Sequence, residues 1–155
     1  MWYIEKCKLI ELTQSLHSFG EKAQICYPFD IRGVEFISIG SNVFIGPRVL
    51  LGADENARID IEDYVMFGPN VSILAGDHRY DLVNTEICLS GAGKRGNVII
   101  KRGAWIGAYT VILKNVIIGE GAVIGAGSVV TKSVPANEIW AGNPARFVKK
   151  RFKEN

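Results

Sequence analysis

The hydrophobic residues of this chain recur with a period of six over much of its length. From residue 100 onward every sixth residue is aliphatic, and a second small or apolar residue stands two positions before each of them. The aliphatic positions are Ile100, Ile106, Ile112, Ile118, Ile124 and Val130, and the earlier positions are Val98, Ala104, Thr110, Val116, Ala122 and Ser128. An upstream block repeats the pattern at Ile39, Ile45 and Leu51, and again at Ile61, Phe67 and Ile73.

The period predicts a β-helix. Alternate side chains of a strand face the same way, so the two apolar positions of each hexad point inward together. Glycine often follows the aliphatic residue, as in Ile106-Gly107, and lets the chain turn a sharp corner. Three hexads then complete one triangular coil, and stacked coils bury a continuous aliphatic column. Short strands with glycine turns also occur in β-sandwiches, but six consecutive hexads without a slip argue against that fold.

The period is interrupted twice. The aliphatic positions on either side of residues 52–58 are ten apart, which predicts a small insertion at a corner. Ile73 and Ile100 are twenty-seven apart, which predicts a long excursion loop over residues 76–96. Insertions in a solenoid lie on its surface, where functional residues gather.

The 155 residues predict a single domain with three parts. Residues 1–33 lack the hexad and are expected to form an irregular or strand-like cap on the first coil. Residues 34–135 form the β-helix. Residues 136–155 form a tail in which Pro144 begins a short helix.

Composition excludes several classes. A net charge of +2 does not indicate a nucleic-acid surface. Three cysteines without a C-x-x-C motif predict neither a disulfide framework nor a zinc site. Glu5 and Glu11 interrupt the first apolar stretch, and no apolar run reaches the ~18 residues of a membrane span, so we expect a cytoplasmic protein without membrane contact.

Several segments together resemble the hexapeptide-repeat acetyltransferases over about residues 34–150, most of all the maltose/galactoside and polysaccharide O-acetyltransferase branch. These segments are the hexads, Gly76-Asp77-His78, Trp105-Ile106-Gly107-Ala108, the run from Val123 to Lys132, and Ala141-Gly142-Asn143-Pro144-Ala145-Arg146. The resemblance implies a left-handed helix, which the period alone does not determine. It also implies a homotrimer with three sites in the clefts between prisms, and acetyl-CoA as co-substrate with no metal.

The resemblance makes His78 the general base. The only other histidine is His17, in the expected cap. An alcohol holds its proton far above neutral pH, and an imidazole with a pKa near ~6.5 can accept that proton during attack. Asp77, Asp81 or a backbone carbonyl can orient the imidazole, and the sequence does not choose among them.

The resemblance assigns further contacts. The backbone N–H of Ala108 stabilises the oxyanion of the thioester carbonyl. The remaining acetyl-CoA contacts are expected from Trp105, Ala126, Thr131, Lys132, Arg146 and Lys149, with the cations near the phosphates. Asp54 matches an acid near the acceptor, although a turn aspartate is an equal interpretation.

Other interpretations of the sequence stay open. The sequence lacks the N-terminal helical segment of the maltose type, and it has Gly46-Pro47-Arg48-Val49 where that branch carries an acceptor-binding asparagine. These departures leave the identity of the acceptor open. The resemblance itself predicts O-acetylation of a sugar or other glycan-precursor acceptor. The alternatives are N-acetylation of an amino sugar or antibiotic, or an inactive trimeric scaffold. A γ-type carbonic anhydrase needs three zinc-binding histidines, and the chain has two.

Overall fold

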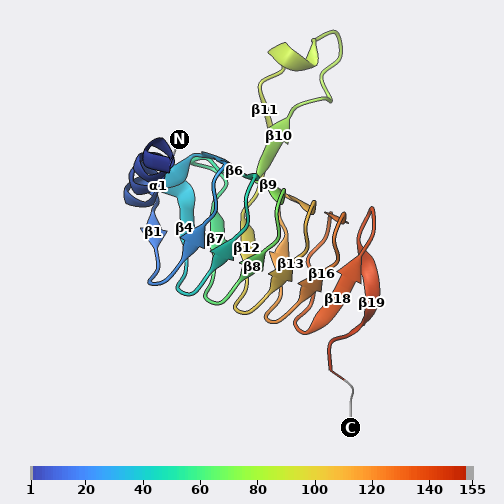
Figure 1. Cartoon of the computed structure of the whole chain (residues 1–155). Coiled ribbons are helices and arrows are strands. Elements are labelled where there is room, and N and C mark those ends of the chain that lie inside the picture. The colour runs from blue at the N-terminus through green and yellow to red at the C-terminus, as the bar shows by residue number, and fades with distance from the viewer. Residues whose placement is uncertain (1, 153–155) are drawn as a thin grey trace.

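The computed structural model describes residues 2–152, with side chains from residue 7 onward. Three sheets, parallel except for the last strand of one, form the faces of a prism, and the chain visits them in turn as each coil is completed (Figure 1). We call them sheets A, B and C. Sheet A contains β1 (Ser18–Phe19), β4 (Ile37–Ile39), β7 (Ile59–Ile61), β12 (Val98–Ile100) and β15 (Ile117–Ile118). Sheet B contains β2 (Gln24–Ile25), β5 (Phe44–Ile45), β8 (Met66–Phe67), β13 (Trp105–Ile106), β16 (Val123–Ile124), β18 (Glu138–Ala141) and β19 (Arg146–Lys150). Sheet C contains β3 (Phe29–Arg32), β6 (Val49–Gly52), β9 (Ser72–Leu74), β14 (Val111–Leu113) and β17 (Val129–Val130).

The core is the column of inward hexad residues, as the period predicted. Every residue of the two hexad series from 98 to 130 is at most 1% exposed. The ladders stack these residues in register, so that Ile118 lies between Ile100 and Val134. Two inward positions are polar and are satisfied locally. Thr110 donates through Oγ1 to the carbonyl of Gly107 at 2.8 Å, and Ser128 donates to that of Gly125 at 2.5 Å.

Close backbone approach explains the corner glycines. A Cβ on Gly107 would lie 2.6 Å from the backbone N of Ala126 and 2.7 Å from the carbonyl oxygen of Ile124, both on the next coil. Any side chain there would push two coils apart, because both neighbours are backbone atoms.

The N-terminal expectation is wrong in conformation and in its bounds. Residues 2–15 form a helix, α1 (Trp2–Ser15), and the β-helix begins at Ser18 rather than at residue 34. The chain therefore has an N-terminal helix, whereas the sequence was interpreted as lacking the N-terminal helical segment of the maltose type. Leu9 and Leu12 of α1, together with Leu16 just beyond it, pack on the core. Their i, i+3, i+7 spacing places them on one face, which covers the open end of the aliphatic column (Figure 1).

The expected C-terminal helix from Pro144 is also wrong within the described residues. β18 extends sheet B beside β16, and β19 turns back and pairs with β18 antiparallel. The hairpin forms because Ile139 and Trp140 continue the ladder from Val123 and Ile124, and the outer strand then covers the sheet end. Residues 153–155 of the expected helix lie outside the described part of the chain.

The two interruptions of the period lie at the corner where sheet C passes into sheet A. Residues 52–58 form the small insertion, closed by backbone pairing of Asp54 with Ala57. The longer excursion is an antiparallel arm of β10 (Gly76–His78) and β11 (Ala92–Arg95), which projects from the prism (Figure 1). Two 3₁₀ turns, η1 (Val34–Phe36) and η2 (Ile87–Leu89), complete the described elements. No helix among residues 2–152 is long and apolar enough to cross a membrane.

Candidate active site

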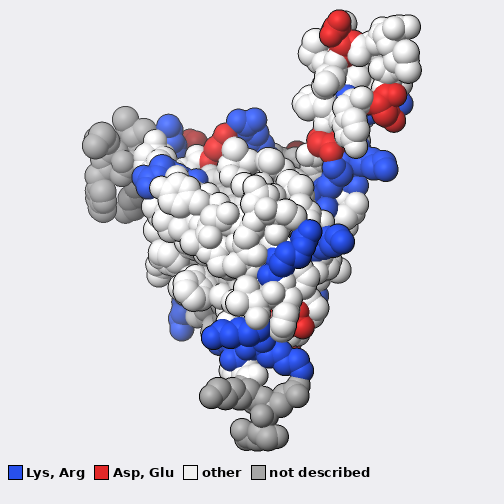
Figure 2. All heavy atoms as spheres, turned by 90° about the vertical axis from the view of Figure 1, so that its right-hand side faces the viewer, with Lys and Arg blue, Asp and Glu red and all other residues white. Residues whose placement is uncertain are grey.

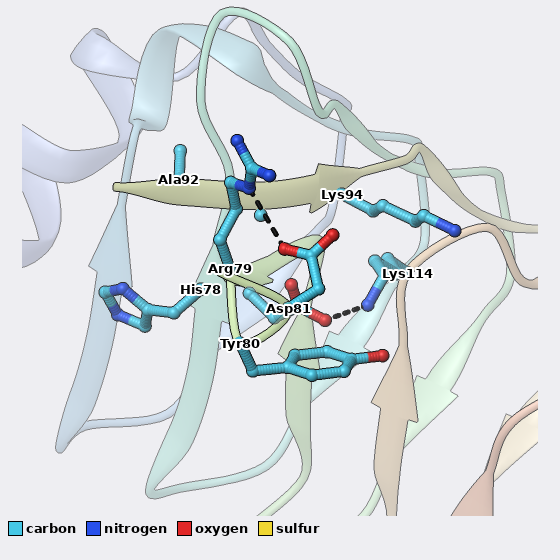
Figure 3. Close-up of a pocket in the computed structure, with 9 residues that line it drawn as sticks. His78, Arg79, Tyr80, Asp81, Ala92, Lys94 and Lys114 are labelled. Atoms are coloured by element: carbon cyan, nitrogen blue, oxygen red, sulfur yellow. Dashed lines mark hydrogen bonds and ion pairs between the residues drawn. The ribbon is translucent and has the colours of Figure 1, made fainter. Parts of the chain in front are cut away.

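His78 lies at the base of the arm, at the end of β10, where its backbone pairs with Ala92 of β11. Its side chain is exposed to solvent. Beside it is a hollow of about 300 Å³ formed by both strands of the arm and the next coil (Figure 3). The lining residues are Asp77, His78, Arg79, Tyr80, Asp81, Ala92, Gly93, Lys94 and Lys114.

The acids near His78 are both paired with cations. Asp77 accepts a hydrogen bond from the ammonium of Lys114, and Asp81 accepts one from Nε of Arg79 at 3.1 Å. The hydrogen bond from Arg79 lowers the pKa of the Asp81 carboxyl below its usual value. Each acid that the sequence offered as an orienting partner for His78 therefore has another partner. Lys114 and Arg79 were not singled out from the sequence, because a lone surface cation carries no signal of the residue with which it will pair.

Asp54 lies at the foot of the arm, on the small insertion of the preceding coil. Its Oδ2 is 2.5 Å from Nη1 of Arg95, on β11, and its Oδ1 accepts the backbone N–H of Asn56 at 3.0 Å. The residue is thus a turn aspartate in an ion pair with the arm. This places it at the same corner as His78.

Ala108 and Ala126 lie at a different corner, where sheet B passes into sheet C. They occupy equivalent positions on adjacent coils, and Gly127 N–H donates to the Ala108 carbonyl at 2.8 Å. Ala108 is half-buried and Ala126 is exposed. Trp105 precedes this corner on β13, points outward with 49% of its surface exposed, and lines a hollow of about 560 Å³ on the face of sheet B.

The four residues expected near the phosphates are all exposed and lie in two places. Thr131 and Lys132 follow β17 at the corner that carries the arm, two coils beyond it. Arg146 and Lys149 lie on β19, at the end of sheet B. Figure 2, which views the prism from its C-terminal end, shows Lys and Arg side chains gathered where the described chain ends.

One prism therefore does not bring all the predicted residues together. The arm leaves the corner between sheets C and A, whereas Ala108 and Ala126 stand at the corner between sheets B and C. An outward apolar row also crosses sheet B in register: Phe44, Met66, Trp105, Val123 and Ile139. Within residues 2–152 no group of three or more His, Cys, Asp or Glu side chains is arranged to hold a metal ion.

Stacked hexapeptide coils with a histidine-bearing arm define a hexapeptide-repeat protein. The family described as "Bacterial transferase hexapeptide (six repeats)" matches residues 97–132. The chain is 33% identical over 148 residues to a galactoside O-acetyltransferase of Lactococcus lactis subsp. lactis, covering 94% of this chain and 69% of the relative. The chain therefore belongs to the hexapeptide-repeat acetyltransferases, and it is an acyltransferase.

Two solved structures share the fold. A hexapeptide-repeat-containing acetyltransferase from Vibrio cholerae O1 biovar eltor, solved with acetyl coenzyme A, has a TM-score of 0.86 and 27% identity, over 96% of this chain and 79% of its own. The N-acyltransferase AntD of Bacillus cereus was solved as a mutant with dTDP-4-amino-4,6-dideoxyglucose and coenzyme A. It has a TM-score of 0.75 and 26% identity, over 96% of this chain and 89% of its own. The left-handed parallel β-helix that the resemblance implied is thereby confirmed.

Proposed function

We propose that this protein is an acetyl-CoA-dependent O-acetyltransferase that modifies a hydroxyl of a sugar or glycan-precursor acceptor, with His78 as general base. The observation that carries the proposal is the position of His78 at the base of the arm, where its side chain is exposed, in a chain that belongs to the acetyltransferases. A base so placed can reach an acceptor that enters from solvent.

The reaction requires one proton transfer and one acyl transfer. The imidazole of His78 accepts the hydroxyl proton while the acceptor oxygen forms a bond to the thioester carbonyl carbon. The carbon–sulfur bond then breaks, and the proton passes to the departing sulfur to give coenzyme A. The backbone N–H of Ala108 donates to the carbonyl oxygen as it becomes negative. No acetyl-enzyme intermediate is needed.

The active unit is a homotrimer. His78 and Ala108 lie on different corners of one prism, so a complete site needs the arm of one protomer beside the other corner of its neighbour. The outward apolar row of sheet B supports such contact, because apolar surface in register along a whole face favours association. Light scattering should give three times the mass of the chain, and a stable monomer at micromolar concentration would contradict the proposal.

Acetyl-CoA lies in the cleft between protomers. Trp105 lines the thiol end, and the exposed backbone of Ala126 meets the pantetheine arm. Thr131 and Lys132 lie beside the adenosine phosphates together with Arg146 and Lys149. The exposed position of all three cations leaves them able to reach a phosphate group.

A sugar hydroxyl is the preferred acceptor because the galactoside O-acetyltransferase matches nearly the whole chain. Asp54 contacts the acceptor, as its place at the foot of the arm allows. The second candidate is N-acylation of an amino sugar, which the likeness to the AntD complex favours. We place the reaction in the cytoplasm, where thiols such as the free Cys7, Cys26 and Cys88 stay reduced.

The test is thiol release from acetyl-CoA with a panel of acceptors: a methyl galactoside, maltose and dTDP-4-amino-4,6-dideoxyglucose. The first two offer only hydroxyls, and the third offers an amine. Turnover confined to the amino sugar, with an acetyl product that survives mild alkali as an amide does and an ester does not, would replace O-acetylation by the second candidate. Absence of turnover with every acceptor would contradict both.

His78→Ala should lower kcat by about 10²-fold or more and leave acetyl-CoA binding nearly unchanged, because the base contacts the acceptor proton and not the coenzyme. His17→Ala is the matched control, since His17 immediately precedes β1, which is three strands away in sheet A from β12, the strand that follows the arm. Near-normal turnover in His78→Ala, or greater damage in His17→Ala, would move the site elsewhere on the prism.

A further inference from the structure

Asp77 and His78 are neighbours on β10, so their side chains point to opposite sides of the strand. Figure 3 shows His78 directed away from the side on which Lys114 lies. The Lys114 ammonium donates a hydrogen bond to the Asp77 carboxylate. Asp77 therefore holds the strand from one side and leaves His78 free on the other.

Lys114 belongs to the next coil and not to the arm. It follows β14, whose Leu113 is in register with Leu74 at the end of β9, just before the arm begins. The ion pair with Asp77 thus joins the first strand of the arm to a rigid corner whose neighbouring inward residues are fully buried. The side chains of Lys114 and Asp77 are 25% and 39% exposed, so solvent only partly screens the attraction between them.

The rest of the arm has few anchors. At its base Gly96 N–H donates to the Ala75 carbonyl at 3.0 Å, and Arg95 of β11 pairs with Asp54 of the preceding coil. The pairing of β10 with β11 has an irregular register between Gly76 and His78. Beyond the base, residues 78–89 are exposed throughout. Side-chain contacts to the prism therefore decide the direction in which β10 leaves the corner.

We propose that Lys114 is a positioning residue, which fixes the direction of β10 through Asp77 and so sets the place of the His78 imidazole. The inference rests on the proposed role of His78 as base. A displacement of about 1 Å can cost on the order of 10²-fold in rate, because proton transfer needs the base within hydrogen-bond reach. A partly exposed ion pair adds little to folding stability, so its loss should appear in kcat rather than in the melting temperature.

The kinetic test compares Lys114→Met, which keeps the length and removes the charge, with Lys114→Arg, which keeps the charge. Lys114→Met should lower kcat about ten-fold with the best acceptor of the panel, with the KM for acetyl-CoA within about two-fold of wild type. Lys114→Arg should restore most of the rate, and Asp77→Asn should behave as Lys114→Met.

The matched control is Lys101→Met. Lys101 also bridges two coils by pairing with a carboxylate, that of Glu62 at 2.6 Å, but at the corner between sheets A and B. This variant should keep wild-type kcat. Wild-type kcat in Lys114→Met, or a loss of equal size in Lys101→Met or in Lys114→Arg, would overturn the proposal.

Amide hydrogen exchange tests the same anchor without the reaction. Lys114→Met should speed exchange in residues 76–79 and 91–95 and leave the coils unchanged. If the wild-type protein turns over no acceptor, the proposed function fails while exchange still decides whether Lys114 holds the arm. Unchanged exchange in the arm would overturn the anchor itself.

Discussion

The strongest quantitative prediction concerns two adjacent isoleucines of β15. Ile118 is fully buried between Ile100 and Val134, whereas Ile117 points outward and is 43% exposed. The outward column of sheet A also carries Ser38 and Asp60, so Ile117 does not belong to the apolar row of sheet B. The two residues have the same side chain and adjacent positions, so a difference in stability between their alanine variants reports the difference in burial.

Ile118→Ala removes three buried carbon atoms, which corresponds to roughly 2.4 kcal/mol at ~0.8 kcal/mol per methylene group. The ladder holds the neighbouring coils about 4.8 Å apart, so the space cannot close and a cavity cost is added. We expect a loss of about 3–4 kcal/mol in the free energy of unfolding, and a melting temperature lower by roughly 6–16 °C for a domain of this size.

The assay is urea and thermal unfolding of wild type, Ile118→Ala and Ile117→Ala at one protein concentration, followed by circular dichroism. Ile117→Ala should stay within about 1 kcal/mol of wild type, as is usual for a half-exposed position. Equal losses in the two variants, or a larger loss in Ile117→Ala, would show that the inward register is wrong.

Two further predictions concern a corner and the coenzyme. Gly107→Ala should cost about 1–3 kcal/mol or more, because its Cβ would collide with backbone of the next coil, whereas Gly52→Ala, with no atom nearer than 3.9 Å, should be neutral or slightly stabilising in thermal unfolding. A stable Gly107→Ala would contradict the corner geometry. Arg146→Ala and Lys132→Ala should each raise the acetyl-CoA KM more than they lower kcat, because phosphates are remote from the reacting carbon, with Lys101→Ala as the control in steady-state assays. An unchanged KM in both variants would refute the placement of the phosphates.

The β-helix and its inward residues could be predicted because each hexad specifies its own local structure. Alternation decides which residues face inward, and glycine after the aliphatic residue marks the corner. The first coil was missed, although Phe19, Ile25 and Ile31 are also six apart. That run is short. The helix before it was also hard to recognise, because its exposed Ile10 does not fit the apolar face formed by the leucines.

The structure at each end of the prism depends on the tertiary contacts that the outermost coil makes available. Pro144 is as suitable for a helix start as for a turn, and only the open edge at β16 favours a hairpin. The N-terminal helix is decided in the same way, because Leu12 and Leu16 gain burial only against a column that already exists. Local propensity is weak beside such tertiary contacts.

The sequence was enough to predict the repeat, the core positions, the place of the arm and the histidine on it, since each depends on the spacing of residues that are near one another in the chain. Three relations emerged only from the folded chain: Asp77 meets Lys114, Asp54 meets Arg95, and His78 and Ala108 stand on different corners. These relations join residues that are tens of positions apart. They depend on how many residues each coil and insertion contains, and so on which side chains stacking brings to one corner, which no local pattern records.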